Sequence, residues 1–185
     1  SSPQRRPFRG AVQQSLLLWQ VRQSVLWYNH IAAVTLGSGV GTGLILNSKL
    51  YSGNNTGAGE FGMIPYLDKY IEYYCSGQFF NLFKQTDGLA VFEQAKNGDE
   101  KALKMYEEYG HHLGQYLKIL LLAIDPEVII LGGSLSAAYS FFEKEMRKAL
   151  LDFPYPKTIS NLEIKVSNLP EIAILGAAAL TFNEN

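Results

Sequence analysis

Acidic residues are absent from the first 59 positions of this 185-residue chain, and the first one is Glu60. Four of the five arginines and both tryptophans lie among residues 1–30. Over the whole chain the charges nearly cancel, with a net charge of −1. This balance gives no overall electrostatic reason to expect binding to nucleic acid or to an anionic membrane surface.

Cysteine and long apolar runs are also scarce. Cys75 is the only cysteine, which excludes an internal disulfide and any zinc site built from several cysteines, and fits a reducing compartment. The longest apolar run, residues 119–124, is far shorter than the roughly 20 residues that a membrane-spanning helix needs. No secretory signal is evident, because the apolar run at 16–19 is too short. We therefore expect a cytoplasmic protein.

The most informative stretch is 31–47, IAAVTLGSGVGTGLILN, where two short apolar runs flank a glycine-rich loop. The runs 31–36 and 44–47 are partly β-branched, which favours buried strands. Glycines at every second position from 37 to 43 let a ligand approach the backbone closely. Backbone N–H groups there can bind phosphate oxygens, and Thr35 can add a hydroxyl. A tight β-turn without a ligand is the simpler alternative.

This loop matches neither of the two best-known phosphate-binding motifs. No lysine follows before Lys49, as a GxxxxGK[ST] loop would require, and a strand follows where a dinucleotide fingerprint needs a helix.

Two glutamates lie in unusual surroundings. Glu60 stands among glycines in AGEFGM, and Glu72 stands among aromatic residues in YIEYYCSG. Carboxylates in such settings can accept hydrogen bonds from ligand hydroxyls, as sugar sites require. The alternative for Glu60 is an ordinary solvated loop acid, whereas a half-buried Glu72 would need polar partners.

The rest of the chain alternates helices with short strands. Asp99 can cap a long buried helix that runs to residue 124, where Asp125-Pro126 breaks it. Adjacent histidines at 111 and 112 do not have the spacing of metal ligands on a helix, so we expect them at the surface or at the edge of the core. The patterns predict helices at 78–84, 89–96, 135–151 and 172–182 and strands at 128–131 and 163–166.

A second glycine site follows the predicted strand 128–131, at Gly132 and Gly133. Strand, double glycine and helix start together direct backbone N–H groups outward at the carboxyl end of a strand, where open α/β sheets bind ligands. Alone, this is a weak signal.

Five motifs in register give the chain a family resemblance. In order, they are TLGSGVGTG, GAGEFG, EYYCSG, IDPEVIILGGSLS and ILGAAAL. Together they resemble the carboxyl-terminal part of the ROK family of bacterial sugar kinases and sugar-responsive repressors. The resemblance covers residues 31–182, and it implies an α/β fold of the actin-like or hexokinase-like (ribonuclease H-like) type, with a mixed sheet flanked by helices.

The resemblance also implies ligands and site residues. ATP with Mg²⁺ and a small-molecule sugar would bind in a cleft between two domains of the intact protein. The implied phosphate-binding residues are Thr35, Gly37, Gly39 and Gly41; Gly132 and Gly133 would lie near the adenosine; Glu60 and Glu72 would bind sugar hydroxyls.

One departure from the family pattern concerns zinc. Members of the family usually carry a histidine where this chain has Met63, and their cysteine cluster is missing here. Met63 and Cys75 cannot form a tetrahedral zinc site, so we expect no zinc. The aromatic stretch 66–74 would pack where the metal loop lies in other members.

A second departure concerns catalysis. The family's catalytic aspartate precedes the glycine loop by about two dozen residues, in a part of this chain that has no acid. The catalytic residue is therefore unknown, and the amino-terminal domain is missing from the resemblance. We divide the chain into an atypical segment, 1–30, and a carboxyl-terminal lobe, 31–185. The composition of 1–30 suggests a segment foreign to the fold, translated from another reading frame.

Three functions follow from this pattern. The first is a truncated ROK-type sugar kinase that phosphorylates a hexose or amino sugar with ATP, with this chain inactive alone. The second is the sugar-sensing domain of a ROK repressor, which binds nucleic acid only if a DNA-binding domain lies upstream. The third is an oligomerisation module built on the long helix. A lobe without its partner domain would expose apolar surface, so we expect a homo-oligomer.

Overall fold

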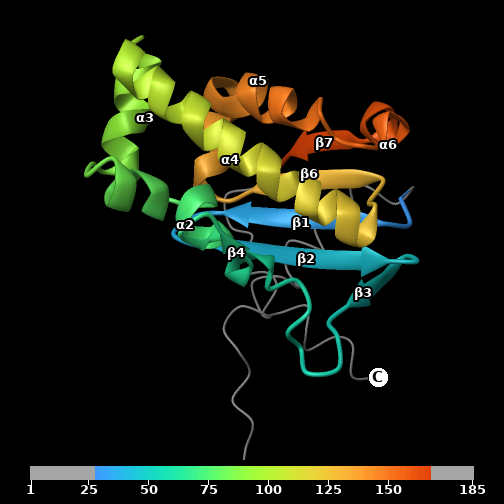
Figure 1. The fold of residues 1–185 in the computed structure, drawn as a ribbon. Helices are drawn as coiled ribbons and strands as arrows, with labels where there is room; N and C mark the ends of the chain where they lie inside the picture. The colour runs from blue at the N-terminus through green and yellow to red at the C-terminus, as the bar shows by residue number, and fades with distance from the viewer. Residues whose placement is uncertain (1–27, 168–185) are drawn as a thin grey trace, which may run out of the picture.

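The computed structural model describes residues 28–167, whose centre is a mixed five-stranded sheet (Figure 1). The strand order is β3-β2-β1-β6-β7. β1 (Ile31–Leu36), β2 (Val40–Leu46) and β3 (Lys49–Tyr51) form an antiparallel meander. β6 (Val128–Gly132) lies parallel to β1, and β7 (Glu163–Val166) lies parallel to β6. The carboxyl ends of three parallel strands therefore meet at one edge of the sheet.

The glycine-rich stretch forms the tight connection between β1 and β2. The sequence suggested that the second strand begins at residue 44, but it begins at Val40. The strand is longer because Gly41 and Gly43 stay paired with Thr35 and Ala33 of β1. The turn itself is limited to residues 37–39. Two of the four glycines are therefore strand residues without side chains.

Two long helices cover one face of the sheet (Figure 1). α4 (Glu100–Ile124) begins at Asp99, whose carboxylate accepts a hydrogen bond from Ala102 N at 2.8 Å. It ends at Asp125, which adopts the left-handed conformation. α5 (Tyr139–Leu150) packs against α4 at Gly110 and Gly114. A Cβ added at either glycine would lie only 2.4–2.6 Å from atoms of α5. The small residues thus let the two helices approach closely.

The side chains of the sheet alternate between two apolar clusters. Even-numbered β1 residues, such as Ala32, Val34 and Leu36, join the large core under α4 and α5. The smaller cluster on the other face contains Ile31, Ala33, Ile45, Val128 and Ile130. This two-sided burial explains why β1 and β6 read as continuous apolar runs in the sequence.

Shorter elements connect the meander to α4 and complete the fold after α5. They are η1 (Phe61–Met63), β4 (Pro65–Tyr66), β5 (Lys69–Tyr70), α2 (Ile71–Cys75), η2 (Phe79–Phe83) and α3 (Gly88–Lys96), with η3 (Ser134–Ala138) between β6 and α5 and α6 (Pro156–Asn161) before β7. Within 28–167, no helix is both long and apolar enough to cross a bilayer.

Most of the predicted elements are present, with local differences. The strands at 128–131 and 163–166 and the helix after Asp99 are confirmed. The helix predicted at 78–84 is a short π-helical segment, and the one predicted at 135–151 starts as a 3₁₀ turn before α5. The predicted helix 172–182 and most of segment 1–30 lie outside the described residues.

Candidate nucleotide and sugar site

The β1–β2 turn is held by hydrogen bonds between backbone groups. Gly37 N donates to Gly39 O at 3.1 Å, and Gly77 N donates to Gly37 O at 2.7 Å. The second bond ties the end of the EYYCSG motif to the glycine turn. Among the described residues, no heavy atom comes within 4 Å of a Cβ added at Gly37 or Gly41. The backbone is therefore open to a ligand at these two positions.

The strand residues beside the turn form one register row. Thr35 on β1 is opposite Gly41 on β2 and opposite Gly132 on β6. Thr35 is half-buried, and both of its neighbours in the row lack a side chain. Three of the predicted phosphate- and adenosine-binding residues thus lie side by side, at the carboxyl ends of β1 and β6.

Glu72 points from α2 toward the glycine turn. Its Oε2 accepts a hydrogen bond from Val40 N at 3.2 Å, and its Oε1 accepts one from Gln78 Nε2 at 3.2 Å. A Cβ added at Gly39 would lie 2.6 Å from Oε2, so the absence of a side chain there makes room for the carboxylate. Both oxygens of Glu72 are therefore oriented by neighbouring groups, and each keeps further acceptor capacity.

Glu60 lies at the start of η1, close to the same turn. Its carbonyl accepts a hydrogen bond from Met63 N at 3.1 Å, and its side chain is exposed. Gly62, two residues later, packs against Val40 and Glu72, with an added Cβ 2.9 Å from Val40 O and 3.5 Å from Glu72 Cβ. The segments that carry the two predicted sugar ligands therefore adjoin each other beside the turn.

Gly133 makes the closest approach between the two glycine segments. Its φ is +90°, and an added Cβ would lie 2.4 Å from Leu36 O at the end of β1. Its own carbonyl accepts a hydrogen bond from Ser136 Oγ at 2.7 Å. Only glycine fits this backbone conformation and this spacing.

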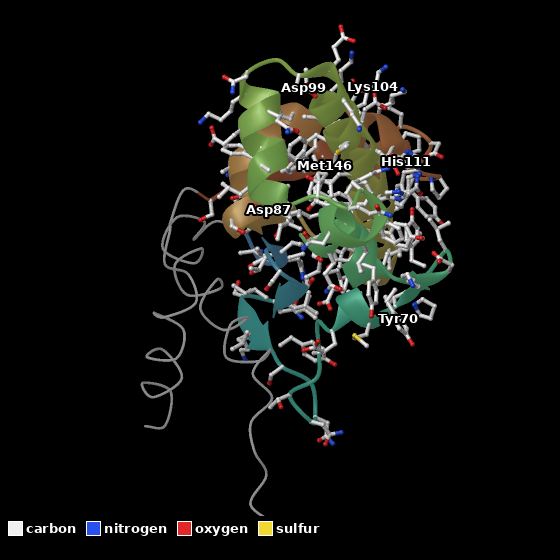
Figure 2. All side chains as sticks on the ribbon, turned by 90° about the vertical axis from the view of Figure 1, so that its left-hand side faces the viewer. Tyr70, Asp87, Asp99, Lys104, His111 and Met146 are labelled. Carbon is white, nitrogen blue, oxygen red and sulfur yellow. The ribbon has the colours of Figure 1, made fainter. Side chains whose placement is uncertain are left out.

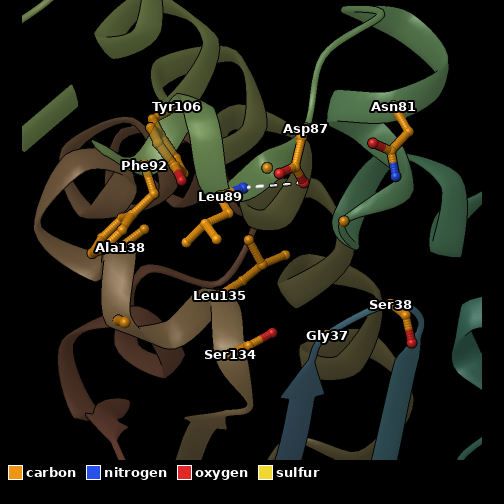
Figure 3. A pocket seen from close by; sticks show the side chains of 13 residues that line it. Gly37, Ser38, Asn81, Asp87, Leu89, Phe92, Tyr106, Ser134, Leu135 and Ala138 are labelled. Atoms are coloured by element: carbon orange, nitrogen blue, oxygen red, sulfur yellow. Dashed lines mark hydrogen bonds between the residues drawn. The ribbon is translucent and has the colours of Figure 1, made fainter. Parts of the chain in front are cut away.

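A pocket of about 400 Å³ opens between the glycine turn, α3 and η3 (Figure 3). Gly37 and Ser38 line it from the turn after β1, and Ser134 and Leu135 line it from the segment after β6. The turn after β1 and the segment that follows Gly133, nearly 100 residues apart in the sequence, therefore share one pocket, whereas Gly132 and Gly133 themselves do not line it. Its position outside the carboxyl ends of parallel strands is the usual ligand position in open α/β sheets.

The walls of the pocket differ in chemistry. Leu89 and Phe92 of α3 face Leu135 across an apolar gap (Figure 3). Asn81 and Asp87 add polar groups at the other side, and Asp87 caps α3 through Leu89 N at 3.4 Å. Figure 2 shows Asp87 at the start of α3 and Asp99 beyond the other end of this helix. An apolar slot with polar groups at its rim suits a flat heterocycle that carries a polar tail.

The aromatic stretch 66–74 packs on α4. Tyr66 Oη and His112 Nδ1 are 3.0 Å apart, and the Tyr74 ring stacks on Phe83 with 4.6 Å between centroids. Burial lowers the pKa of His112 and raises that of Tyr66 to about 12, so both groups are neutral at pH 7. His112 therefore lies at the core edge, as the sequence suggested, and the exposed His111 lies at the surface.

The two sulfur-bearing residues near this stretch lie in different environments. Met63 is 56% exposed, whereas Cys75 is fully buried in the main core. Burial raises the pKa of the Cys75 thiol well above its usual range, so it stays protonated. A thiol in this state is a poor metal ligand.

Sequence reasoning missed the far wall of the pocket. It identified the glycine segments and both glutamates, but not Asn81, Leu89, Phe92 or Leu135. Apolar residues on helices are ordinarily core residues, and nothing in their spacing marks these ones as pocket lining. The one available signal was Asp87-Gly88, a helix start that follows the glycine motifs in the chain.

A family model describes nearly the whole chain. The model of the ROK family matches residues 10–184. This chain belongs to the ROK family. The matched range begins inside segment 1–30, earlier than the motifs themselves indicated.

Several curated relatives of the chain are named as sugar kinases. It is 33% identical over 133 residues to the N-acetylgalactosamine kinase AgaK of Shewanella sp. strain ANA-3, a match that covers 59% of this chain and 43% of the relative. It is 24% identical over 184 residues to the glucokinase of Thermotoga maritima, covering 83% of this chain and 58% of the relative. The chain thus spans about half the length of these ROK relatives.

Solved structures share the fold. A putative sugar kinase from Cytophaga hutchinsonii superposes with a TM-score of 0.79 at 21% identity, covering 91% of this chain and 64% of the other. A ROK family glucokinase from Streptomyces griseus, in complex with glucose and AMPPNP, superposes with a TM-score of 0.75 at 22% identity, and the match covers 91% of this chain and 66% of the glucokinase. A ROK family transcriptional regulator superposes with a TM-score of 0.74 at 18% identity, and the match covers 90% of this chain and 50% of the regulator. The predicted actin-like, hexokinase-like fold is confirmed.

Proposed function

We propose that this chain supplies the nucleotide- and sugar-binding lobe of an ATP-dependent ROK sugar kinase that phosphorylates a hexose or amino sugar. The observation that carries the proposal is the pocket that lies between the β1–β2 turn and the segment after Gly133, beside the turn that Glu72 contacts. A nucleotide in this pocket would have its phosphates near the β1–β2 turn, and a sugar bound by the glutamates would lie beyond them. Transfer of a phosphoryl group needs this adjacency.

The backbone geometry fits the phosphates of ATP. Gly37 and Gly41 leave open space where side chains would stand, Gly39 and Gly41 lead from the turn into β2, and Thr35 lies opposite Gly41 on β1. Gly132 and Gly133 would flank the adenosine. In ROK kinases of this kind Mg²⁺ would enter bound to the ATP phosphates, since Mg²⁺ commonly takes most of its ligands from substrate and water. We assign it no side chain of this lobe, and we assign no zinc.

The two glutamates would bind sugar hydroxyls. Glu72 is preoriented by Val40 N and Gln78, and Glu60 lies on the adjoining segment. A fixed carboxylate loses little entropy when it accepts a hydroxyl hydrogen bond. The general base stays unassigned, because no acidic residue precedes Glu60 in this chain. We therefore infer that the chain alone does not turn over, and that 1–30 is an atypical segment ahead of the lobe 31–185.

A sugar-responsive regulator is the second candidate, favoured by the structural match to a ROK transcriptional regulator. Calorimetry separates the alternatives. A kinase lobe binds both ATP and a sugar, a regulator binds sugar alone, and an oligomerisation module binds neither. The sugars to test are glucose and the N-acetylated amino sugars named in the relatives. Absence of binding by both ligand types would refute the kinase proposal.

Two further properties belong to the proposal. We infer a cytoplasmic location, because ATP and the products of sugar uptake meet there. We also infer self-association, because large apolar side chains are exposed on β3, on η1 and just after β4. They belong to Leu50, Tyr51, Met63 and Leu67. Light scattering tests the second point, and a monomer at high concentration would contradict it.

A further inference from the structure

The nucleotide pocket contains one buried hydroxyl group that has nothing to bond. Tyr106 projects from α4 into the wall of the pocket beside Phe92, with its hydroxyl toward Leu89 (Figure 3). Its side chain is 0% exposed, and its Oη is the one buried side-chain polar atom among the described residues that lacks a hydrogen-bond partner. A buried hydroxyl without a partner destabilises a folded protein, because it gives up its hydrogen bonds to water and gains none.

Neighbouring tyrosines on the same helix show that the fold usually meets this requirement. Tyr109 Oη donates to Cys75 O at 2.9 Å, and Tyr116 Oη is hydrogen-bonded to Thr42 Oγ1. Both are as deeply buried as Tyr106. Of the three tyrosines, only Tyr106 lines the pocket. The tyrosine whose hydroxyl lacks a partner is therefore the one that lines the pocket, where a ligand could supply the hydrogen bond.

The ring of Tyr106 is fixed, so its hydroxyl cannot turn away to find solvent. It packs against Phe80 with 5.1 Å between ring centroids and against Phe141 with 5.6 Å. Burial raises the pKa of Tyr106 to about 12, so the group is a neutral hydroxyl at physiological pH. Such a hydroxyl can donate one hydrogen bond and accept others.

We propose that Tyr106 is the base-recognition residue of this pocket, and that its hydroxyl hydrogen-bonds to the polar edge of the nucleotide base held between Leu89, Phe92 and Leu135. This proposal rests on the proposed nucleotide site and adds to it a residue that contacts the base. A base edge has ring nitrogens and exocyclic groups, and either kind satisfies a neutral hydroxyl. The energy gained includes relief of the unpaired group in the free protein.

The test is the Tyr106→Phe variant, which keeps the ring and removes only the hydroxyl. Without ligand, its melting temperature should equal or exceed that of the wild type, because no hydrogen bond is lost. Its affinity for ATP should fall roughly fivefold to tenfold, the range expected for one hydrogen bond to a neutral group. Its affinity for inorganic tripolyphosphate, which has no base, should not change.

Tyr109→Phe is the matched control. It removes the hydroxyl that satisfies Cys75 O, so its melting temperature should fall while its ATP affinity stays at the wild-type value. A second measurement needs no variant: in a chain labelled with ¹³C at tyrosine Cζ, ATP should shift the Tyr106 signal and tripolyphosphate should not.

The outcomes separate the two proposals. If the wild type binds ATP and Tyr106→Phe binds it equally well, or the Tyr106 Cζ signal does not move, the role of Tyr106 is refuted while the nucleotide site stands. If the wild type binds neither ATP nor tripolyphosphate, the proposed function fails and the role of Tyr106 fails with it.

Discussion

The carboxylate of Glu72 accepts a hydrogen bond from the backbone amide of Val40, 3.2 Å away, and so joins α2 to the first residue of β2. Gly39 leaves the space that this carboxylate fills. The proposed sugar ligand and the proposed phosphate-binding turn therefore form one structural unit. A change on either side of this contact should affect the other.

Substitutions of Gly39 in the turn and of Gly41 in β2 should differ in their effect on sugar binding. Gly39→Ala adds a methyl group 2.6 Å from Glu72 Oε2, so it should displace the carboxylate and weaken sugar binding. Gly41→Ala meets no described atom, so it should leave sugar binding intact and weaken ATP binding by filling the open backbone. Calorimetry with each ligand on both variants measures this. A loss of sugar affinity in Gly41→Ala as large as that in Gly39→Ala would contradict this account of Glu72.

Glu60→Gln should weaken sugar binding with little effect on stability. Replacing a charged acceptor with a neutral amide removes a charge-assisted hydrogen bond, which is worth about 1.5–3 kcal/mol. The side chain is exposed, so the free energy of unfolding should change by less than about 0.5 kcal/mol. Glu100→Gln, at the exposed start of α4, serves as a control that leaves sugar affinity unchanged. An unaltered affinity for Glu60→Gln would remove Glu60 from the site.

Gly133→Ala should destabilise the fold far more than the same change at Gly98. Both glycines have positive φ, +90° and +81°, so each variant suffers backbone strain of about 1–2 kcal/mol. Only at Gly133 does the new Cβ also meet backbone, at 2.4 Å from Leu36 O. We expect a loss above roughly 3 kcal/mol at Gly133. Denaturant unfolding measures both variants, and similar losses would show that β1 and η3 are not this close.

Stability should decrease as the pH falls below about 6.5, because His112 is buried and neutral in the folded protein. Its pKa is lowered by burial and by His111 and Lys84, while Glu108 opposes the shift. In the window between the lowered folded pKa and the ordinary pKa, the unfolded chain binds more protons, so acid favours unfolding. Above the ordinary pKa the contribution is complete.

The matched variants for this pH effect are His112→Asn and His111→Asn. The free energy of unfolding is measured against pH for the wild type and for His112→Asn, and the second curve is subtracted from the first. The contributions of the carboxylates that both proteins share cancel, and the difference should keep a slope in that window. His111→Asn removes one of the groups that lower the pKa of His112 but leaves its burial unchanged, so its slope should persist and be smaller than that of the wild type. A wild-type slope that persists in His112→Asn would assign the effect to another group.

Local patterns in the sequence predicted the strands and the long helix well. The strand 31–36 and the helix from Asp99 to residue 124 were correct because apolar spacing and capping residues agreed there. The helix α2 was missed because its five residues, IEYYC, are too few to reveal a period and rich in aromatic residues. Its stability comes from packing on α4 rather than from propensity.

The site was only half accessible from sequence. Glycines and isolated acids are conspicuous, so the sequence pointed to the turn, Gly133 and both glutamates, whose ligand roles stay predictions. The pocket wall on α3 and the unpaired Tyr106 depend on which face of each helix meets the ligand, and the pattern of apolar residues is the same for a core as for a pocket. Tertiary structure alone distinguishes these two roles.

The central claim is that one nucleotide binds between the β1–β2 turn and the segment after β6. The most direct measurement is a titration of the ¹⁵N-labelled chain with ATP and Mg²⁺, followed by amide chemical shifts. We expect the largest shifts at Gly37, Ser38, Ser134 and Leu135. Shifts confined to a pocket of about 490 Å³ at the opposite end of the sheet, around Tyr28 and Lys157, or no shifts at all, would contradict a nucleotide at this place.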